Sequence, residues 1–313
     1  MLIIMIKEEI NMRYNKTKKI LMFWCLFIGI CAVFGSLGMF IDPTGNLMGM
    51  NDILPYFKVL PFSNILFQNF IFPGIALLIV NGISNLLAFY LLMKNKKPGI
   101  ILGTIFGFTL MLWITIQFII LPMNALSIIY FVFGFIQLIT GYMTYVFYMQ
   151  ENFKFDIKKY DNISKNKNCI VVYFSRMGYT RKIAYEIANQ ECSDIIEIKT
   201  KEKTDGTIGF WWCGRYGMHK WNMDIESIDI NLKEYDKVII VSPIWVFSIC
   251  APIRDFCYKY GKDINEVTYV FTHFMKTKFN IVAHELDKIL NKKRSEFISI
   301  CIRFGKVKKI YNK

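Results

Sequence analysis

The stretch CIVVYFSRMGYT, residues 169–180, decides the fold of the second half of this 313-residue chain. Its first part, Ile170–Phe174, is a continuous apolar run, as expected for a strand that is buried on both faces of a parallel sheet. A short turn with Ser175, Gly178 and Thr180 follows, and then a helical pattern begins. Backbone N–H groups in such a turn, at the start of a helix, favour the binding of anions. The sequence therefore predicts a phosphate site at the first strand–helix junction of an open parallel sheet.

A second segment of the same kind, KVIIVSPIWVFSICAPIRDFCYKY, occupies residues 237–260. An apolar strand is followed by a turn and then by a helical pattern. The turn contains Pro243, Ile244, Trp245 and Val246. Trp245 could cover a large flat ring by stacking, and the alternative is a position in the core or at an interface.

The turn after residue 174 resembles the phosphate loop of flavodoxins, which is usually written Ser/Thr-x-Thr-Gly-x-Thr. The tryptophan loop is similar to the flavodoxin loop that follows the third strand. The resemblance covers roughly residues 168–302 and implies flavin mononucleotide (FMN) as cofactor, with Trp245 against its ring. It assigns the phosphate to Ser175, Arg176, Met177, Gly178, Tyr179 and Thr180. Met177 departs from the family pattern, because a hydroxyl residue is usual there.

Further strands are predicted at 194–199, 267–272 and 296–302, and further helices at 180–190, 251–260 and 278–290. This alternation predicts an α/β flavodoxin-like, doubly wound parallel sheet with strand order 2-1-3-4-5 and the cofactor at its switch point. After the fourth strand, the resemblance implies a second aromatic against the flavin, a role that Phe274 could fill. His273 either hydrogen-bonds near the ring or caps the turn. Eleven residues follow Ile302, so we expect the final helix to be truncated or absent.

The first half of the chain contains long uncharged stretches. They predict four membrane-spanning helices, at 20–41, 71–93, 98–121 and 124–149. At about 1.5 Å per residue, the first of these is roughly 33 Å long, enough for the hydrocarbon core of a bilayer. We therefore predict an all-α transmembrane four-helix domain at 1–150, a linker at 151–167 and the flavodoxin-like FMN-binding domain at 168–313. Met12 is an alternative start to Met1.

Basic residues flank the predicted helices unevenly. Five Lys and Arg residues precede the first helix, three lie between the second and third, and three follow the fourth within residues 152–159. The segment 42–70 contains only Lys58. By the positive-inside rule, we expect a multi-pass cell-membrane protein with both termini in the cytoplasm.

Several classes of function are disfavoured by composition. The predicted helices contain no Asp, Glu, Lys, Arg or His, which argues against a proton-coupled pump. Their polar residues, such as Asn81, Asn85 and Gln137, are expected to form interhelical hydrogen bonds. The eight cysteines form no CxxC pair, and no metal site is predicted. The net charge of +14 suits anionic lipid, and we expect no nucleic-acid partner because no nucleic-acid motif is visible.

An unusual aromatic cluster, residues 209–221, lies in the crossover between the second and third strands. It either packs on the sheet, walls the flavin pocket, or faces the membrane or a partner. A face left open by the short C-terminal segment would pack on the helical bundle, on lipid or on another subunit, so a homo-oligomer is one possibility.

Electron transfer at the membrane is the function that the resemblance implies, with a redox partner protein or a quinone. One alternative is an enzyme, a nicotinamide-dependent reductase of quinone or of another small acceptor. The other is a flavin-free scaffold on a membrane bundle, an option that Met177 keeps open. No catalytic residue is predicted, and whether the protein is an enzyme stays open.

Overall fold

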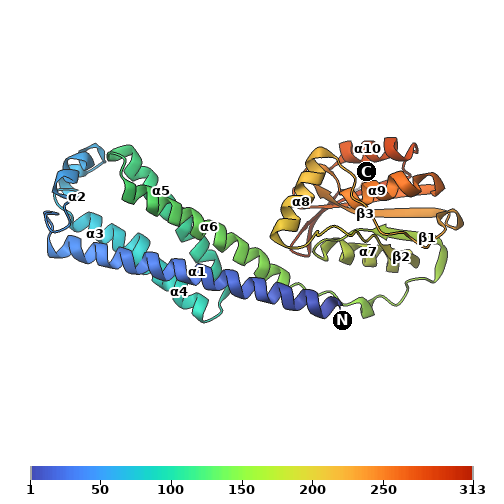
Figure 1. Cartoon of the computed structure of the whole chain (residues 1–313), viewed down its shortest axis with the longest axis horizontal. Helices are drawn as coiled ribbons and strands as arrows, with labels where there is room; N and C mark the ends of the chain where they lie inside the picture. Colours follow the sequence, from blue (N-terminus) through green and yellow to red (C-terminus); the bar gives the residue numbers. More distant parts are fainter. Residues whose placement is uncertain (1, 312–313) are drawn as a thin grey trace. The chain divides into compact units, whose positions relative to one another are not determined.

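The chain forms two compact units in the computed structural model, which describes residues 2–311. The first unit ends at Asn152 and the second begins at Phe153. The first is helical, and the second combines a sheet with helices (Figure 1).

The helical unit contains four segments that are long and apolar enough to cross a membrane: Met12–Ile41, Ile71–Met93, Lys97–Ile120 and Ala125–Glu151. The corresponding helices are α1 (Leu2–Ile41), α3 (Ile71–Leu77) continued by α4 (Ser84–Met93), α5 (Lys97–Ile120) and α6 (Ala125–Glu151), with the short α2 (Ser63–Leu66) before α3. They coincide closely with the four predicted helices, except that α1 starts well before residue 20. The added segment is rich in Lys, Glu, Ile and Met, and most of these residues are good helix formers.

Polar side chains are buried between these helices. Leu78–Ile83 forms a π-helical turn that joins α3 to α4, and Asn85 is buried just after it. The Gln137 side chain of α6 donates to Asn85 Oδ1 at 2.8 Å and to the carbonyl oxygen of Gly103 at 2.9 Å. The predicted interhelical hydrogen bonding is thus confirmed for Asn85 and Gln137.

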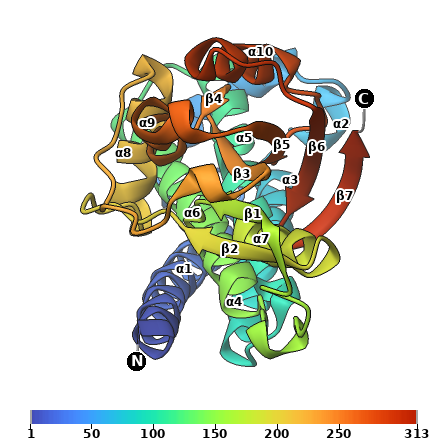
Figure 2. The same ribbon diagram turned by 90° about the vertical axis from the view of Figure 1, so that its right-hand side faces the viewer.

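The second unit contains a mixed seven-stranded sheet. Its five parallel strands are β1 (Asn166–Tyr173), β2 (Ser193–Glu197), β3 (Lys237–Trp245), β5 (Glu266–His273) and β6 (Glu296–Arg303), and their spatial order is β2-β1-β3-β5-β6 (Figure 2). Among the parallel strands this is the predicted order 2-1-3-4-5. Two antiparallel strands were not predicted: β4 (Ser248–Ile249), which pairs with β3, and β7 (Lys306–Tyr311), which pairs with β6.

Helices cover both faces of the sheet (Figures 1 and 2). On one face lies α7 (Tyr179–Gln190), and on the other lie α8 (Gly206–His219), α9 (Ala251–Tyr260) and α10 (Asn280–Leu290). Alternate residues of a strand enter different cores: Ile170 and Val172 pack toward α9 and α10, whereas Val171 packs toward α7. Because both faces are buried, the strand sequence is continuously apolar.

The C-terminal segment forms a strand rather than a final helix within the described residues. The chain reverses at Phe304 and Gly305, which have φ of 50° and 77°, and returns as β7 along the edge of β6. The strand β7 in this segment was not expected.

Residues of the predicted linker pack on α7. The ring of Phe155 lies 5.3 Å from that of Tyr185, and the ring of Tyr160 lies 5.7 Å from it. The ring of Phe153 lies 4.9 Å from that of Tyr179. These aromatic contacts add to the cover that α7 provides on its face of the sheet.

Candidate cofactor site

The turn between β1 and α7 has the geometry of an anion-binding turn. Gly178 has φ of 84°, a conformation that side chains rarely adopt, and its N–H donates to Ser175 Oγ at 3.1 Å. The next residue, Tyr179, opens α7, and no described side chain caps this helix end. The first amides of a helix have no acceptor within the helix itself. They are therefore available to a phosphate group, which the helix dipole also favours.

The side chain of Thr180 ties this turn to the neighbouring strand β5. Thr180 is buried, and its Oγ1 lies 2.8 Å from Oγ1 of Thr272, near the end of β5. Pro243 of β3 pairs with Thr272 in the sheet, so the ends of β1, β3 and β5 meet here. The hydroxyl of Thr180 thus positions α7, and the backbone amides are the groups left for an anion. Thr272 was not predicted; its signal was a hydroxyl at the end of an apolar strand.

Arg176 places a positive charge beside the turn. Its guanidinium lies 5.3 Å from the ring centre of Phe210 on α8, and Nη1 donates to the carbonyl oxygen of Gly206 at 3.4 Å. Its Nη2 lies 2.9 Å from the sulfur of Met177. Met177, which replaces the usual hydroxyl residue, therefore contacts the arginine instead of offering a hydrogen-bond donor to phosphate.

Aromatic side chains also border the turn. The hydroxyl of Tyr179 is buried without a hydrogen-bond partner among the described residues, and burial raises its pKa to about 12. A Cβ added to Gly178 would lie 3.3 Å from the ring of Phe153. Phe153 was not predicted as part of the site because the surrounding segment is polar; the signal in the sequence was the close spacing of Phe153, Phe155 and Tyr160.

The tryptophan loop is a tight hairpin between β3 and β4. Ile244 pairs with Ile249, and the two residues at the tip, Val246 and Phe247, have φ of 45° and 62°. Such values at both central positions are typical of type I′ turns, although glycine and asparagine are the usual residues there. Trp245 is half-buried, and its ring meets that of Phe174 edge-on at 5.5 Å. The structure thus places Trp245 beside Phe174, which directly follows β1.

A buried arginine fixes this hairpin. Arg254 of α9 donates to Ser248 Oγ at 2.5 Å and to Glu285 Oε1 of α10 at 2.8 Å. Lys220, just after α8, also contacts Glu285, at 3.1 Å. Burial acts to raise the pKa of Glu285, but the hydrogen bonds and charges of Arg254 and Lys220 outweigh it and lower that pKa. The hairpin is therefore held by one ionic network that reaches three helices.

His273 and Phe274 point to different surroundings. His273 is buried, with Nδ1 2.6 Å from the carbonyl oxygen of Met275 and Nε2 2.8 Å from Ser299 Oγ. Burial lowers its pKa, and the contacts favour the turn-capping interpretation. Phe274 is exposed, and its ring lies 5.5 Å from that of Phe304 and 5.1 Å from the guanidinium of Arg303. Trp245, at the end of β3, thus contacts Phe174, whereas Phe274, just after β5, contacts Arg303 and Phe304.

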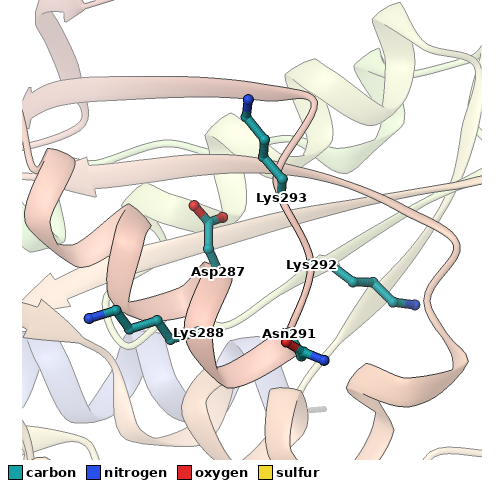
Figure 3. A pocket seen from close by; sticks show the side chains of 5 residues that line it. All are labelled: Asp287, Lys288, Asn291, Lys292 and Lys293. Carbon is teal, nitrogen blue, oxygen red and sulfur yellow. The ribbon is translucent and has the colours of Figure 1, made fainter.

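A separate shallow depression at the end of α10 is not part of this site (Figure 3). Its lining residues are Asp287, Lys288, Asn291, Lys292 and Lys293. Asp287 is paired there with Arg294. The loop after β5 leads into the opposite end of α10. Among residues 2–311, no group of three potential metal ligands occurs.

These observations define a doubly wound α/β unit with a candidate anion site where its strand order reverses. No protein-family model and no curated protein matches the chain. Among solved structures, it is similar to a flavoprotein from Lactobacillus acidophilus NCFM in complex with FMN, with 21% identity over 43% of this chain and 91% of that one and a TM-score of 0.37. It is also similar to a candidate flavoprotein from Bacteroides eggerthii DSM 20697, with 25% identity over 42% and 88% of the two chains and a TM-score of 0.36.

Proposed function

We propose that the protein is a membrane-anchored flavoprotein that binds FMN where β1, β3 and β5 end. The observation that carries this proposal is the β1–α7 turn, because Gly178 has a positive φ and the uncapped start of α7 follows it at once. Ligands of doubly wound sheets bind outside the carboxyl ends of the strands, at the point where strand order reverses. In this sheet, that point lies between β1 and β3.

The residues of the turn fit a phosphate. The amides of Tyr179 and Thr180 would hold it, and Arg176 would supply a compensating charge. The hairpin residues Ile244, Trp245 and Val246, with Phe274 at the end of β5, would border the flavin ring. FMN, when bound, supplies the redox chemistry, and the protein supplies orientation and electrostatics.

Anchoring in a membrane is supported by the four apolar segments of the helical unit. The connecting segments with most Lys and Arg residues are those on the side of both termini. By the positive-inside rule, this distribution favours a cytoplasmic α/β unit at the cell membrane. A redox partner protein or a lipid-dissolved quinone would then exchange electrons with the flavin, and a reduced nicotinamide is a donor of suitable chemistry.

A flavin-free scaffold is the second candidate function. It is favoured by Met177, whose sulfur contacts Arg176, and by Thr180, whose hydroxyl already has Thr272 as its partner. In that case the α/β unit would serve only to bind other proteins or lipid, and a homo-oligomer is one form that such a scaffold could take.

The absorption spectrum of the detergent-purified full-length protein, before and after addition of FMN, separates the two candidates. The flavoprotein proposal expects about one equivalent of bound FMN. A matched pair of variants tests the turn: Gly178→Ala should lower the affinity, whereas Gly49→Ala, at a glycine of positive φ with open space around it, should not. Wild-type protein that stays colourless after addition of FMN would refute the proposal and favour the scaffold.

A further inference from the structure

An exposed apolar surface lies on α8 and the residues just after it, next to the candidate cofactor site. We call it the α8 surface, and it consists of Ile208, Phe210, Trp211, Trp212, Met218 and Trp221. Ile208 and Trp211 are 79% and 73% exposed. The hairpin tip adds Val246 and Phe247, which are also exposed. Large contiguous apolar patches on a protein surface usually mark an interaction site.

Basic side chains accompany these rings. The guanidinium of Arg215 lies 5.8 Å from the ring centre of Trp212 and 5.5 Å from that of Trp221, and Arg176 lies over Phe210. Residues 199–221 contain five Lys and Arg and two Asp and Glu. Tryptophan rings with flanking cations are typical of segments at a membrane interface, where anionic headgroups attract the charges.

Only a short length of chain separates the α/β unit from a candidate span. Phe153 packs beside Gly178 and Tyr179 in the turn of the candidate site. Only Asn152 separates Phe153 from Glu151, the last residue of the segment Ala125–Glu151. Two peptide links reach at most about 8 Å, so a membrane-spanning α6 would leave little free chain before the α/β unit begins.

The same turn is joined to the α8 surface within the α/β unit. Arg176 contacts the carbonyl oxygen of Gly206, at the start of α8, and the ring of Phe210. The turn and the α8 surface are thus neighbours within the α/β unit. Because the surface is net basic, two copies of it would repel each other, whereas an anionic bilayer would attract it.

We propose that the α8 surface docks onto the anionic lipid interface, with its exposed rings inserted at headgroup level. The candidate cofactor site then opens beside the bilayer, and an acceptor dissolved in the lipid, of quinone-like chemistry, reaches it without a soluble carrier. The inference rests on the membrane anchoring in the proposed function but not on flavin binding.

Photocrosslinking in proteoliposomes tests this docking. The full-length protein is reconstituted in vesicles of phosphatidylcholine with phosphatidylglycerol, with p-benzoylphenylalanine in place of Trp211. The matched control carries the same residue in place of Tyr258, which is 55% exposed near the far end of α9. Mass spectrometry then distinguishes adducts with lipid from adducts with a second copy. Extraction of the vesicles with alkaline carbonate reports membrane anchoring separately, and the absorption spectrum reports flavin.

Docking predicts lipid adducts at position 211 in at least about fivefold excess over position 258, and a higher yield with the anionic lipid than with phosphatidylcholine alone. Any one of three results overturns the proposal: equal lipid yields at the two positions, no lipid adduct at position 211, or adducts with a second copy as the main product. Protein that resists carbonate extraction but gives such a result would refute the docking and leave the anchoring intact.

Discussion

Replacement of Arg254 by methionine should destabilise the α/β unit and loosen the tryptophan hairpin. The Arg254 side chain is 4% exposed and its partner Glu285 is 21% exposed. Removal of one partner of a buried ion pair typically costs about 3–5 kcal/mol. In the variant, Glu285 still contacts Lys220 and is partly exposed to solvent. We therefore expect the free energy of unfolding to fall by about 2–3 kcal/mol, at or below the lower end of that range.

Thermal unfolding of the α/β unit, followed by near-ultraviolet circular dichroism in detergent, measures this loss. For a unit of this size, it corresponds to a midpoint lower by roughly 5–10 °C. The double variant Arg254→Met/Glu285→Leu should regain most of it, since no buried charge is then left unpaired. Lys233→Met is the matched control: it removes an exposed pair with Asp263, and its cost should stay under about 1 kcal/mol.

The pH dependence of the midpoint adds a second check. The folded-state pKa of Glu285 is lowered, so its stabilisation is present above the unfolded-state pKa and is lost as pH falls through the folded-state value. Wild type should therefore lose more stability on acidification below about pH 4.5 than the double variant does. A single variant with an unchanged midpoint, or a double variant that is less stable than Arg254→Met, would refute the reasoning.

Three further predictions concern the site. Gly178→Ala should weaken FMN binding about tenfold, because a left-handed backbone conformation costs a residue with a side chain about 1–2 kcal/mol. Titration followed by flavin fluorescence measures the affinity, and an unchanged affinity would contradict this prediction. Tyr179→Phe removes a buried hydroxyl without a described partner, so the thermal midpoint should stay the same or rise, and a clear fall would reveal a missed hydrogen bond. The pKa of His273 is lowered, so its neutral form stabilises the fold and the thermal midpoint should fall as pH drops below about 6.5. In His273→Gln, the midpoint should change less between pH 7 and 5.5. An equal change of midpoint with pH in both proteins would contradict this prediction.

Features that depend on local sequence were predicted well. The apolar runs in β1, β3 and β5 predicted parallel strands, because strands buried on both faces leave no polar alternation. The helix Ala251–Tyr260 was predicted with its observed bounds, and Pro252 is suited to the first turn of a helix. The position of Gly178 in the first turn likewise followed from the motif.

Features that depend on side-chain direction were not predictable. The partner of Thr180 is a residue of β5 that lies 92 positions further along the chain, and nothing in the local sequence indicates the pairing. His273 had two open interpretations, because only the fold shows Ser299 beside it. The packing of Phe153 was not predicted for the same reason, because a polar segment with a few aromatic residues has the composition of a linker.

The strand β7 also has a consequence for how the α/β unit meets other protein chains. An open sheet edge is a template for backbone pairing with other chains. The edge here is formed by β7, whose residues Lys306, Lys308 and Lys309 are exposed. Lysine on an edge strand is a recognised safeguard, because an approaching strand would have to desolvate these charges. The exposed lysines of β7 thus protect this edge of the sheet against unwanted pairing with other chains.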